Sequence, residues 1–331
     1  MGSGRALGSS PSERRALRER WLSTDGELLR EAAIAWLVSG AHSDPPADLG
    51  RIGGRVDLRG LPMPAPALQG VTTTGYSHGA TIKIMGARWS GLDLSGANLE
   101  HLRFHEAEIT DCLFNGGEAA DLRLWRSSVT DCSFAGADLR QAVLGTWLEG
   151  RGNTWRRVSF DGADLRKAVM AGGVLDGCTF VTTRLVGVWF TQMALTDCVF
   201  VGPLRRVVFD GRARREIPEP DPMTRVDFRA AVFRDVAFRG CRVRNVRWPE
   251  SQETRVVERF RKIARRAVGL LEGDTSRNAR KLVAILEPHV KAPGGPDSVG
   301  VFVWDNYIAM GGLDFAKFVW AALDAAEGQT G

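Results

Sequence analysis

The sequence has little of what enzyme and metal sites are usually built from. Its 331 residues include only five histidines and five cysteines, and the histidines are scattered, with His101 and His105 as the one close pair. A zinc site needs three or four such ligands converging on one point. No stretch has the GxxxxGK[ST] spacing of a phosphate-binding loop. We therefore expect no catalytic residue, no metal site and no cofactor, and so a protein that is not an enzyme.

Long apolar runs are also missing. No segment approaches the roughly 18 consecutive apolar residues of a membrane helix, and residues 1–5 do not lead into the apolar core of a signal peptide. The number of cysteines is odd, and four of the five lie at inward positions of the repeat described next. Reduced core thiols are therefore favoured over a disulfide framework. These features predict a cytoplasmic protein that does not enter a membrane.

An internal five-residue repeat organises the chain. Every fifth residue between 109 and 144 is apolar, and a small residue stands two positions earlier in most pentads. The large residues are Ile109, Phe114, Ala119, Leu124, Val129, Phe134, Leu139 and Leu144. A second period lies on top of the first, because the segment TDCLF at 110–114 returns 20 residues later as TDCSF at 130–134. Four pentads therefore make one structural cycle.

Strand geometry turns this cycle into a fold. Extended chain rises about 3.3 Å per residue, so five residues make one short straight side, and four sides make a coil of 20. The small residue and the large one two positions later point the same way, into the coil. Stacked coils satisfy one another's backbone groups at about 4.8 Å spacing. The sequence predicts a β-solenoid whose interior is filled by side chains.

Two insertions interrupt the repeat. Cys132 and Cys178 should share a side but lie 46 residues apart rather than two coils, so six extra residues bulge out within a glycine-bounded loop at 145–153. With that shift, the register predicts one internal column, formed by Leu94, Phe114, Phe134, Phe160, Phe180 and Phe200. Residues 210–223 form a second insertion, which is charged and contains three prolines.

The same pattern divides the chain into four parts. Residues 1–45 predict an N-terminal helical hairpin, capped at 24–27 and stopped by Gly40, that covers the first coil. Residues 46–83 are linker and opening coil, of which 69–83 have no assignment. Residues 84–248 are the β-helix, of about seven coils. Residues 249–331 predict a C-terminal helical region, starting with a helix through Val256 and ending with one at 313–326, whereas 301–304 fits strand or helix. This region either covers the last coil or forms an oligomer contact.

Three pentads carry a family resemblance. ANLEH at 97–101, ADLRQ at 137–141 and ADLRK at 163–167 resemble the A(D/N)LXX signature of the pentapeptide repeat family. The resemblance implies a right-handed quadrilateral β-helix. The best-characterised members bind DNA gyrase or topoisomerase IV and protect it from inhibitors, using projecting loops and often a C-terminal dimer contact. For this chain the resemblance therefore implies a protein partner such as a topoisomerase, and a homodimer through the C-terminal region.

Charge and loops indicate where a partner would bind. Residues 84–144 carry five basic and nine acidic residues, a net charge of −4, whereas residues 205–248 carry twelve and six, a net charge of +6. The first loop presents an apparently exposed Trp147 beside charged residues, which is typical of interface anchors. It is either a neutral insertion or a partner-binding finger. The candidate partner-binding residues are Trp147, Glu149, Arg151, Arg156, Arg157, Arg212, Arg214 and Arg215.

The leading hypothesis is a non-catalytic protein-binding scaffold. The alternative is a nucleic-acid-binding protein that uses the basic distal half of the rod.

Overall fold

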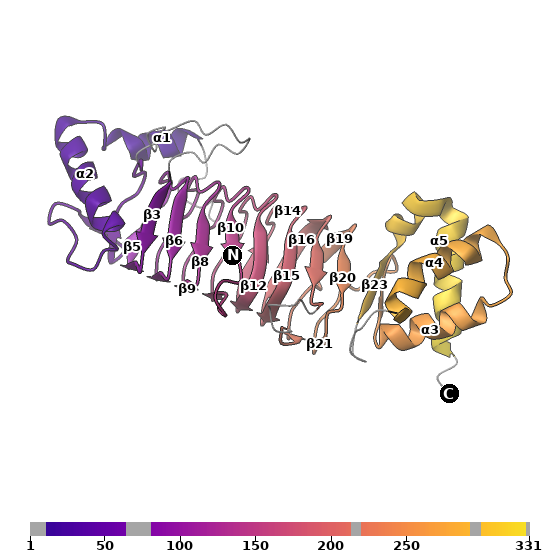
Figure 1. Ribbon diagram of the computed structural model, residues 1–331. Helices are drawn as coiled ribbons and strands as arrows, with labels where there is room; N and C mark the ends of the chain where they lie inside the picture. Colours follow the sequence, from indigo (N-terminus) through magenta and orange to yellow (C-terminus); the bar gives the residue numbers. More distant parts are fainter. Residues whose placement is uncertain (1–10, 64–80, 213–219, 292–298, 329–331) are drawn as a thin grey trace, which may run out of the picture.

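The protein is a straight rod of stacked coils with helices at both ends (Figure 1). The computed structural model describes residues 11–63, 81–212, 220–291 and 299–328. The rod is a β-solenoid of about eight turns, one more than the sequence predicts. The additional turn is the opening one, because β2 (Arg55–Asp57) pairs in parallel with β5 (Leu92–Asp93), while β1 (Arg51–Ile52) folds back antiparallel on β2.

Each turn has four sides, which we number in chain order starting from β3. The first side is a parallel ladder of β3 (Ile82–Met85), β6 (Leu102–His105), β8 (Arg123–Trp125), β10 (Val143–Gly145), β12 (Val169–Asp176), β15 (Trp189–Thr196), β17 (Val208–Asp210) and β20 (Ala237–Arg239). The second side holds β4 (Arg88–Ser90), β7 (Glu108–Thr110), β9 (Ser128–Thr130), β11 (Asn153–Arg156), β18 (Met223–Thr224) and β21 (Val243–Arg244), together with the second halves of β12 and β15.

The third and fourth sides are held mainly by single bridges between turns. β5, β13 (Thr179–Val181) and the start of β16 (Val199–Arg205) lie on the third side. β14 (Leu185–Val186), the end of β16 and β19 (Ala231–Arg234) lie on the fourth. On these two sides the register between turns is therefore kept mostly by isolated bridges rather than by long paired strands.

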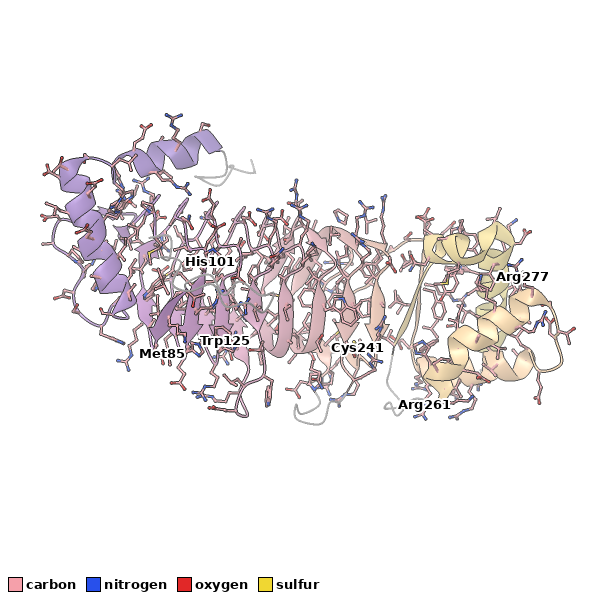
Figure 2. The ribbon with its side chains drawn as sticks, turned by 45° about the horizontal axis from the view of Figure 1, so that its top comes forward. Met85, His101, Trp125, Cys241, Arg261 and Arg277 are labelled. Atoms are coloured by element: carbon pink, nitrogen blue, oxygen red, sulfur yellow. The ribbon has the colours of Figure 1, made fainter. Side chains whose placement is uncertain are left out.

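Left-handed residues make the corners. Between the fourth and first sides, φ is 64° at His101, 57° at Asp121, 60° at Gln141 and 62° at Lys167, one residue per turn. A non-glycine residue pays about 1 kcal/mol or more for this conformation, so the fold accepts strain at each corner in return for a tight turn. The side chain of His101, which is labelled in Figure 2, is 41% exposed at such a corner.

The interior of the third side is a column of stacked rings. Phe114 and Phe134 have ring centroids 4.5 Å apart, and the next contacts upward are Phe134 to Phe160 at 5.7 Å and Phe160 to Phe180 at 5.1 Å. Phe200 follows at 4.6 Å from Phe180. Below Phe114, Leu94 occupies the same place, since Asp93 bridges Leu113. This is the column that the pentad register predicts.

The cysteines also lie in the interior. All five are buried and none forms a disulfide, including Cys241 inside the last turns (Figure 2). Burial raises the pKa of the Cys241 thiol to about 12. Such thiols act as small apolar core residues.

The N-terminal hairpin closes the first turn. It consists of α1 (Pro11–Glu19) and α2 (Thr24–Val38). The cap is one residue earlier than the sequence predicts, because the Oγ of Ser23 accepts the bond from the amide of Gly26 at 3.1 Å. α2 then packs its buried Leu37 on the rod, where the indole of Trp89 donates to the carbonyl of Leu37 at 3.2 Å.

The C-terminal region covers the last turn. It contains β22 (Thr254–Val257), α3 (Phe260–Leu270), α4 (Arg277–Lys291), β23 (Gly300–Val303) and α5 (Trp304–Gly328), which kinks at Gly312. β22 and β23 pair antiparallel, and Val299 and Val303 join the rod's core. The prediction of a helix through Val256 was wrong, because this segment pairs with β23. The residues left open at 301–304 form strand up to Val303.

No helix among the described residues combines the length and apolar character needed to cross a membrane.

Candidate partner-binding site

Both insertions leave the rod from the same edge. The first follows β10 and the second follows β17, and both strands end the first side at its corner with the second (Figure 1). β12 and β15 lie between them and cross this corner without interruption. The two insertions are three turns apart, or about 14 Å. The fold therefore presents them as neighbours along one line.

The first insertion is a small hairpin. Leu148 and Arg151 exchange backbone bonds, 2.9 Å from the amide of Leu148 and 3.1 Å from that of Arg151. Between them, φ is 50° at Glu149 and 79° at Gly150. Two successive positive φ values are the requirement of a type I′ turn, in which glycine costs least. The loop therefore has a defined conformation of its own.

An arginine of the rod holds the tip of this hairpin. Arg126, at the corner of the preceding turn, forms ion pairs with Glu149 in the loop and with Glu106 one turn further back. The Arg126 side chain is only 24% exposed and pairs with one carboxylate on the turn before it and one in the loop. Because the pairs are near the surface, each contributes less than about 1 kcal/mol, which is enough to bias the orientation of the loop.

The base of the loop is closed by a buried amide. Asn153 is 1% exposed, and its side chain accepts from the amide of Ser127 at 2.9 Å. The same side chain donates to the carbonyls of Leu124 and Leu144 at 2.9 and 3.0 Å. These bonds replace the ladder bonds that the insertion interrupts. The rod consequently resumes its register at β11, six residues late, as predicted, since Ser133 bridges Ser159.

Trp147 is half-buried, so the expectation that it is exposed was wrong. Its backbone crosses Gly172 of the next turn so closely that a Cβ on Gly172 would lie 2.9 Å from the Cβ of Trp147. The loop therefore leans over β12 rather than standing clear of it. Trp147 stays partly accessible to solvent.

The described start of the second insertion, residues 210–212, is held by side-chain contacts. Asp210 is buried and receives two bonds from Arg212, at 2.8 and 2.6 Å. The backbone carbonyl of Arg212 accepts from the side chain of Gln192 at 2.9 Å. The hydrogen bonds to the Asp210 carboxylate raise the pKa of the Arg212 guanidinium. The candidates Arg214 and Arg215 lie outside the described residues.

The remaining candidates lie away from this edge. Arg157 is at the corner between the second and third sides and forms two bonds with Asp131, at 2.6 and 2.7 Å. Arg156 lies on the second side, 3.9 Å from Asp176. The structure thus brings Trp147, Glu149 and Arg151 together in one loop, with Arg212 on the same edge, and separates Arg156 and Arg157 from them.

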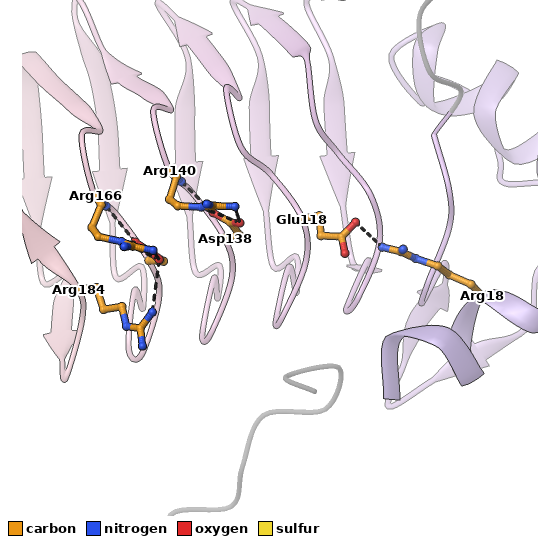
Figure 3. A network of polar contacts seen from close by, with 7 residues as sticks. Arg18, Glu118, Asp138, Arg140, Arg166 and Arg184 are labelled. Carbon is orange, nitrogen blue, oxygen red and sulfur yellow. Dashed lines mark hydrogen bonds and ion pairs between the residues drawn. The ribbon is translucent and has the colours of Figure 1, made fainter. Parts of the chain in front are cut away.

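Sequence reasoning missed a basic surface on the fourth side. Its cations are Arg140, Arg166, Lys167, Arg184, Arg205, Arg206 and Arg234. Figure 3 shows Arg140 and Arg166 lying against Asp138 and Asp164 on successive turns. The sequence feature that could have revealed this surface is an arginine directly after the large inward residue of a pentad, as in Arg140 and Arg166. These arginines can be assigned to one side only when the register of every turn is known.

A groove of about 390 Å³ lies at the proximal end of this surface. It opens beside Ala120, where neighbouring turns carry Glu100 and Arg140. Its lining includes His101, whose Nδ1 lies 3.4 Å from a carboxylate oxygen of Asp121, and Asp121 also forms ion pairs with Arg103 and Arg123.

Comparisons with known proteins identify the repeat. The family model "Pentapeptide repeats (8 copies)" matches residues 86–116. No curated protein matches the chain. Solved structures with similarity include the pentapeptide repeat protein Rfr23 from the cyanobacterium Cyanothece 51142, at 11% identity over 50% of this chain and 90% of that one, with a TM-score of 0.27.

Two further solved structures belong to the same set. Full-length QnrB1, a plasmid-mediated fluoroquinolone resistance protein, is 16% identical over 59% of this chain and 92% of its own, with a TM-score of 0.24. HetL of Nostoc sp. strain PCC 7120, a pentapeptide repeat protein involved in heterocyst differentiation regulation, is 12% identical over 52% and 86%, with a TM-score of 0.17. The family model matches residues 86–116, and the stacked pentads of the rod continue the same pattern, so the chain carries pentapeptide repeats.

Proposed function

We propose that the chain is a non-catalytic scaffold that binds a partner protein along the edge that carries both insertions. The observation that supports this is that both insertions start on one line, where Arg126 holds Glu149 of the first loop and Asp210 and Gln192 hold Arg212 at the start of the second. A loop held in place before binding loses less conformational entropy when it binds. The half-buried Trp147 supplies an aromatic anchor beside the exposed Arg151.

The test is affinity capture with the wild type and with a variant that lacks residues 146–151. The deletion removes six residues and so restores an uninterrupted coil of 20, which should leave the rod folded. We expect one partner to be lost selectively while the circular dichroism spectrum and melting temperature stay close to those of the wild type. Capture of the same proteins by both forms would reject the loop as the binding site.

A type II topoisomerase is the partner that we propose within this function, on the family resemblance. The measurement is gyrase supercoiling in the presence of the purified protein, with and without a gyrase poison. We expect the protein either to relieve the inhibition of gyrase by the poison or to inhibit supercoiling directly. No effect over a wide concentration range would remove this partner and leave the scaffold function untouched.

A homodimer through α5 is a further proposal. Ile308, Met310 and Leu313 are 37%, 51% and 49% exposed on both sides of the kink at Gly312. Exposed apolar patches are typical of protein contacts. Sedimentation should give a dimer for the wild type and a monomer for Leu313→Glu, and a monomeric wild type would end the proposal.

Nucleic-acid binding through the distal half is the second candidate function. It is favoured by exposed arginines such as Arg205, Arg206 and Arg234. The prediction is retardation of DNA or RNA at low salt that weakens steeply as salt rises, and a protein that retards neither at low salt does not have this function.

A further inference from the structure

The basic surface of the fourth side is a regular ladder. Bridges join Asp138 to Asp164 and Asp164 to Arg184, and strand pairing joins Val186 to Arg205 and Arg205 to Arg234. The cations named above therefore occupy five successive turns, with one or two on each. At about 4.8 Å per turn, the ladder is about 19 Å long.

Its charge is only partly neutralised within the chain. Between residues 138 and 235 this side carries seven cations and three carboxylates, those of Asp138, Asp164 and Asp235, and Glu100 adds a fourth carboxylate near Arg140. Asp138 holds Arg140 at 2.6 Å, and Asp164 holds Arg166 at 2.6 Å and lies 3.6 Å from Arg184 (Figure 3). Among the residues that the structure describes, no carboxylate pairs with Lys167, Arg205, Arg206 or Arg234. This part of the surface can therefore attract an anionic partner.

The spacing of the ladder fits carboxylates on a helix. In an α-helix, residues three and four apart are separated by about 4.5 and 6.0 Å along the axis, and these values lie on either side of the coil spacing of about 4.8 Å. An acidic side chain at every third or fourth position would therefore meet one arginine per turn. Flexible arginine side chains can absorb the remaining mismatch over five turns.

The proximal end of the same side already receives a helix. Arg18 of α1 reaches across to Glu118 and forms an ion pair at 2.7 Å (Figure 3). There an arginine on a helix pairs with a glutamate on the rod. Further along the rod the outward side chains of this side are mainly basic instead of acidic. The part near Glu118 is thus suited to a basic helix, and the part from Arg140 to Arg234 is suited to an acidic helix.

Apolar side chains between the cations favour a protein over a nucleic acid. Val186 lies between Arg166 and Arg205, and Val232, which is 51% exposed, lies beside Pro203. The described outward positions of this side from 138 to 235 include no Phe, Tyr or Trp. Single-stranded nucleic acids are usually held by stacking on such rings.

We propose that the basic surface of the fourth side binds an acidic amphipathic helix of a partner protein, with carboxylates spaced one helical turn apart and apolar residues between them. The inference rests on the proposed scaffold function and adds a second contact, away from the loops. The probe is a fluorescently labelled synthetic helix with glutamate at every third or fourth position and leucine beside it. Its control is a peptide of the same composition in which the glutamates do not share a face.

The variants are R205E/R234E and, as a control with the same change in net charge, R88E/R244E. Arg88 and Arg244 are exposed on the second side, on β4 and β21. We expect the full-length protein to bind the patterned helix more tightly than the scrambled one. R205E/R234E should weaken that binding by about tenfold or more, because attraction becomes repulsion at two rungs, and the control pair by less than about twofold.

Three results would overturn the proposal: no binding of the patterned helix, equal weakening by the two variants, or tighter binding of a single-stranded oligonucleotide of the same charge. R205E/R234E leaves both loops intact, and the deletion of residues 146–151 leaves the ladder intact. Loop-dependent capture combined with failure of the peptide to bind would therefore reject the ladder and keep the scaffold function.

Discussion

Replacing Phe180 by alanine tests the stacked interior of the rod most directly. Phe180 is fully buried, and its ring lies 5.1 Å from Phe160, 4.6 Å from Phe200 and 5.9 Å from Phe190, measured between centroids. Removing a buried phenylalanine ring costs about 3–5 kcal/mol, and more where the surroundings cannot collapse into the cavity. The strands around Phe180 are held at fixed spacing by parallel ladders. We therefore expect a loss at the upper end, about 4–5 kcal/mol.

The matched control is Phe180→Leu, which keeps most of the volume and should cost less than about 1.5 kcal/mol. Urea denaturation followed by circular dichroism gives the two free energies of unfolding. Hydrogen exchange should locate the loss in β13 and β16, because each coil of a solenoid contacts only its neighbours. A cost below about 1.5 kcal/mol for the alanine variant, or equal costs for both variants, would refute the stacked interior.

Two further predictions concern the loop and the N-terminal cap. In Gly152→Ala the new Cβ would lie 1.6 Å from the backbone carbonyl oxygen of Gly172, so we expect the free energy of unfolding to fall by about 1–3 kcal/mol. The matched control is Gly150→Ala, whose new Cβ meets nothing within 4 Å. It should cost only about 1 kcal/mol, because Gly150 has a left-handed backbone. Equal losses would contradict the close approach at the loop base. Burial opposes the charge on Asp57, but hydrogen bonds from Arg59 and Arg20 prevail and lower its pKa from 3.8 to about 2. Because the folded-state pKa is the lower one, this stabilisation is complete above about pH 5 and is lost as the pH falls from about 5 to 2. After allowance for solvent screening it amounts to about 1 kcal/mol. Protection factors of the α2 amides, corrected for the intrinsic exchange rate at each pH, should fall over this range, and constant protection factors would contradict the prediction.

The rod could be predicted from the sequence because its constraint is periodic. One inward position in five must be large and apolar, so the register of Phe134 and Phe160 is determined even across the insertion between them. The size of that insertion follows from the same arithmetic. Nothing comparable acts on the outward positions, which are free to vary, so the ladder of Arg166, Arg205 and Arg234 becomes visible only when coils of unequal length are aligned.

Other features depend on contacts that no local pattern encodes. The half-burial of Trp147 results from a glycine in the next coil, Gly172, and the orientation of Glu149 results from Arg126 in the previous one. The segment around Val256 has the apolar spacing of a helix but forms a strand, because pairing with β23 satisfies backbone groups that would otherwise be left open beside the last coil.

The four-sided coil gives insertions and deletions a discrete effect on geometry. Adding 20 residues would move the C-terminal helices about 4.8 Å further along the axis and keep their azimuth. Adding one pentad between the two insertions would instead rotate everything after it by a quarter of a revolution, and the insertions would then start from different edges of the rod. A pair of sites on such a rod can drift apart in whole steps without losing alignment, whereas changes of any other length must be taken up as a bulge, as the six residues after β10 are.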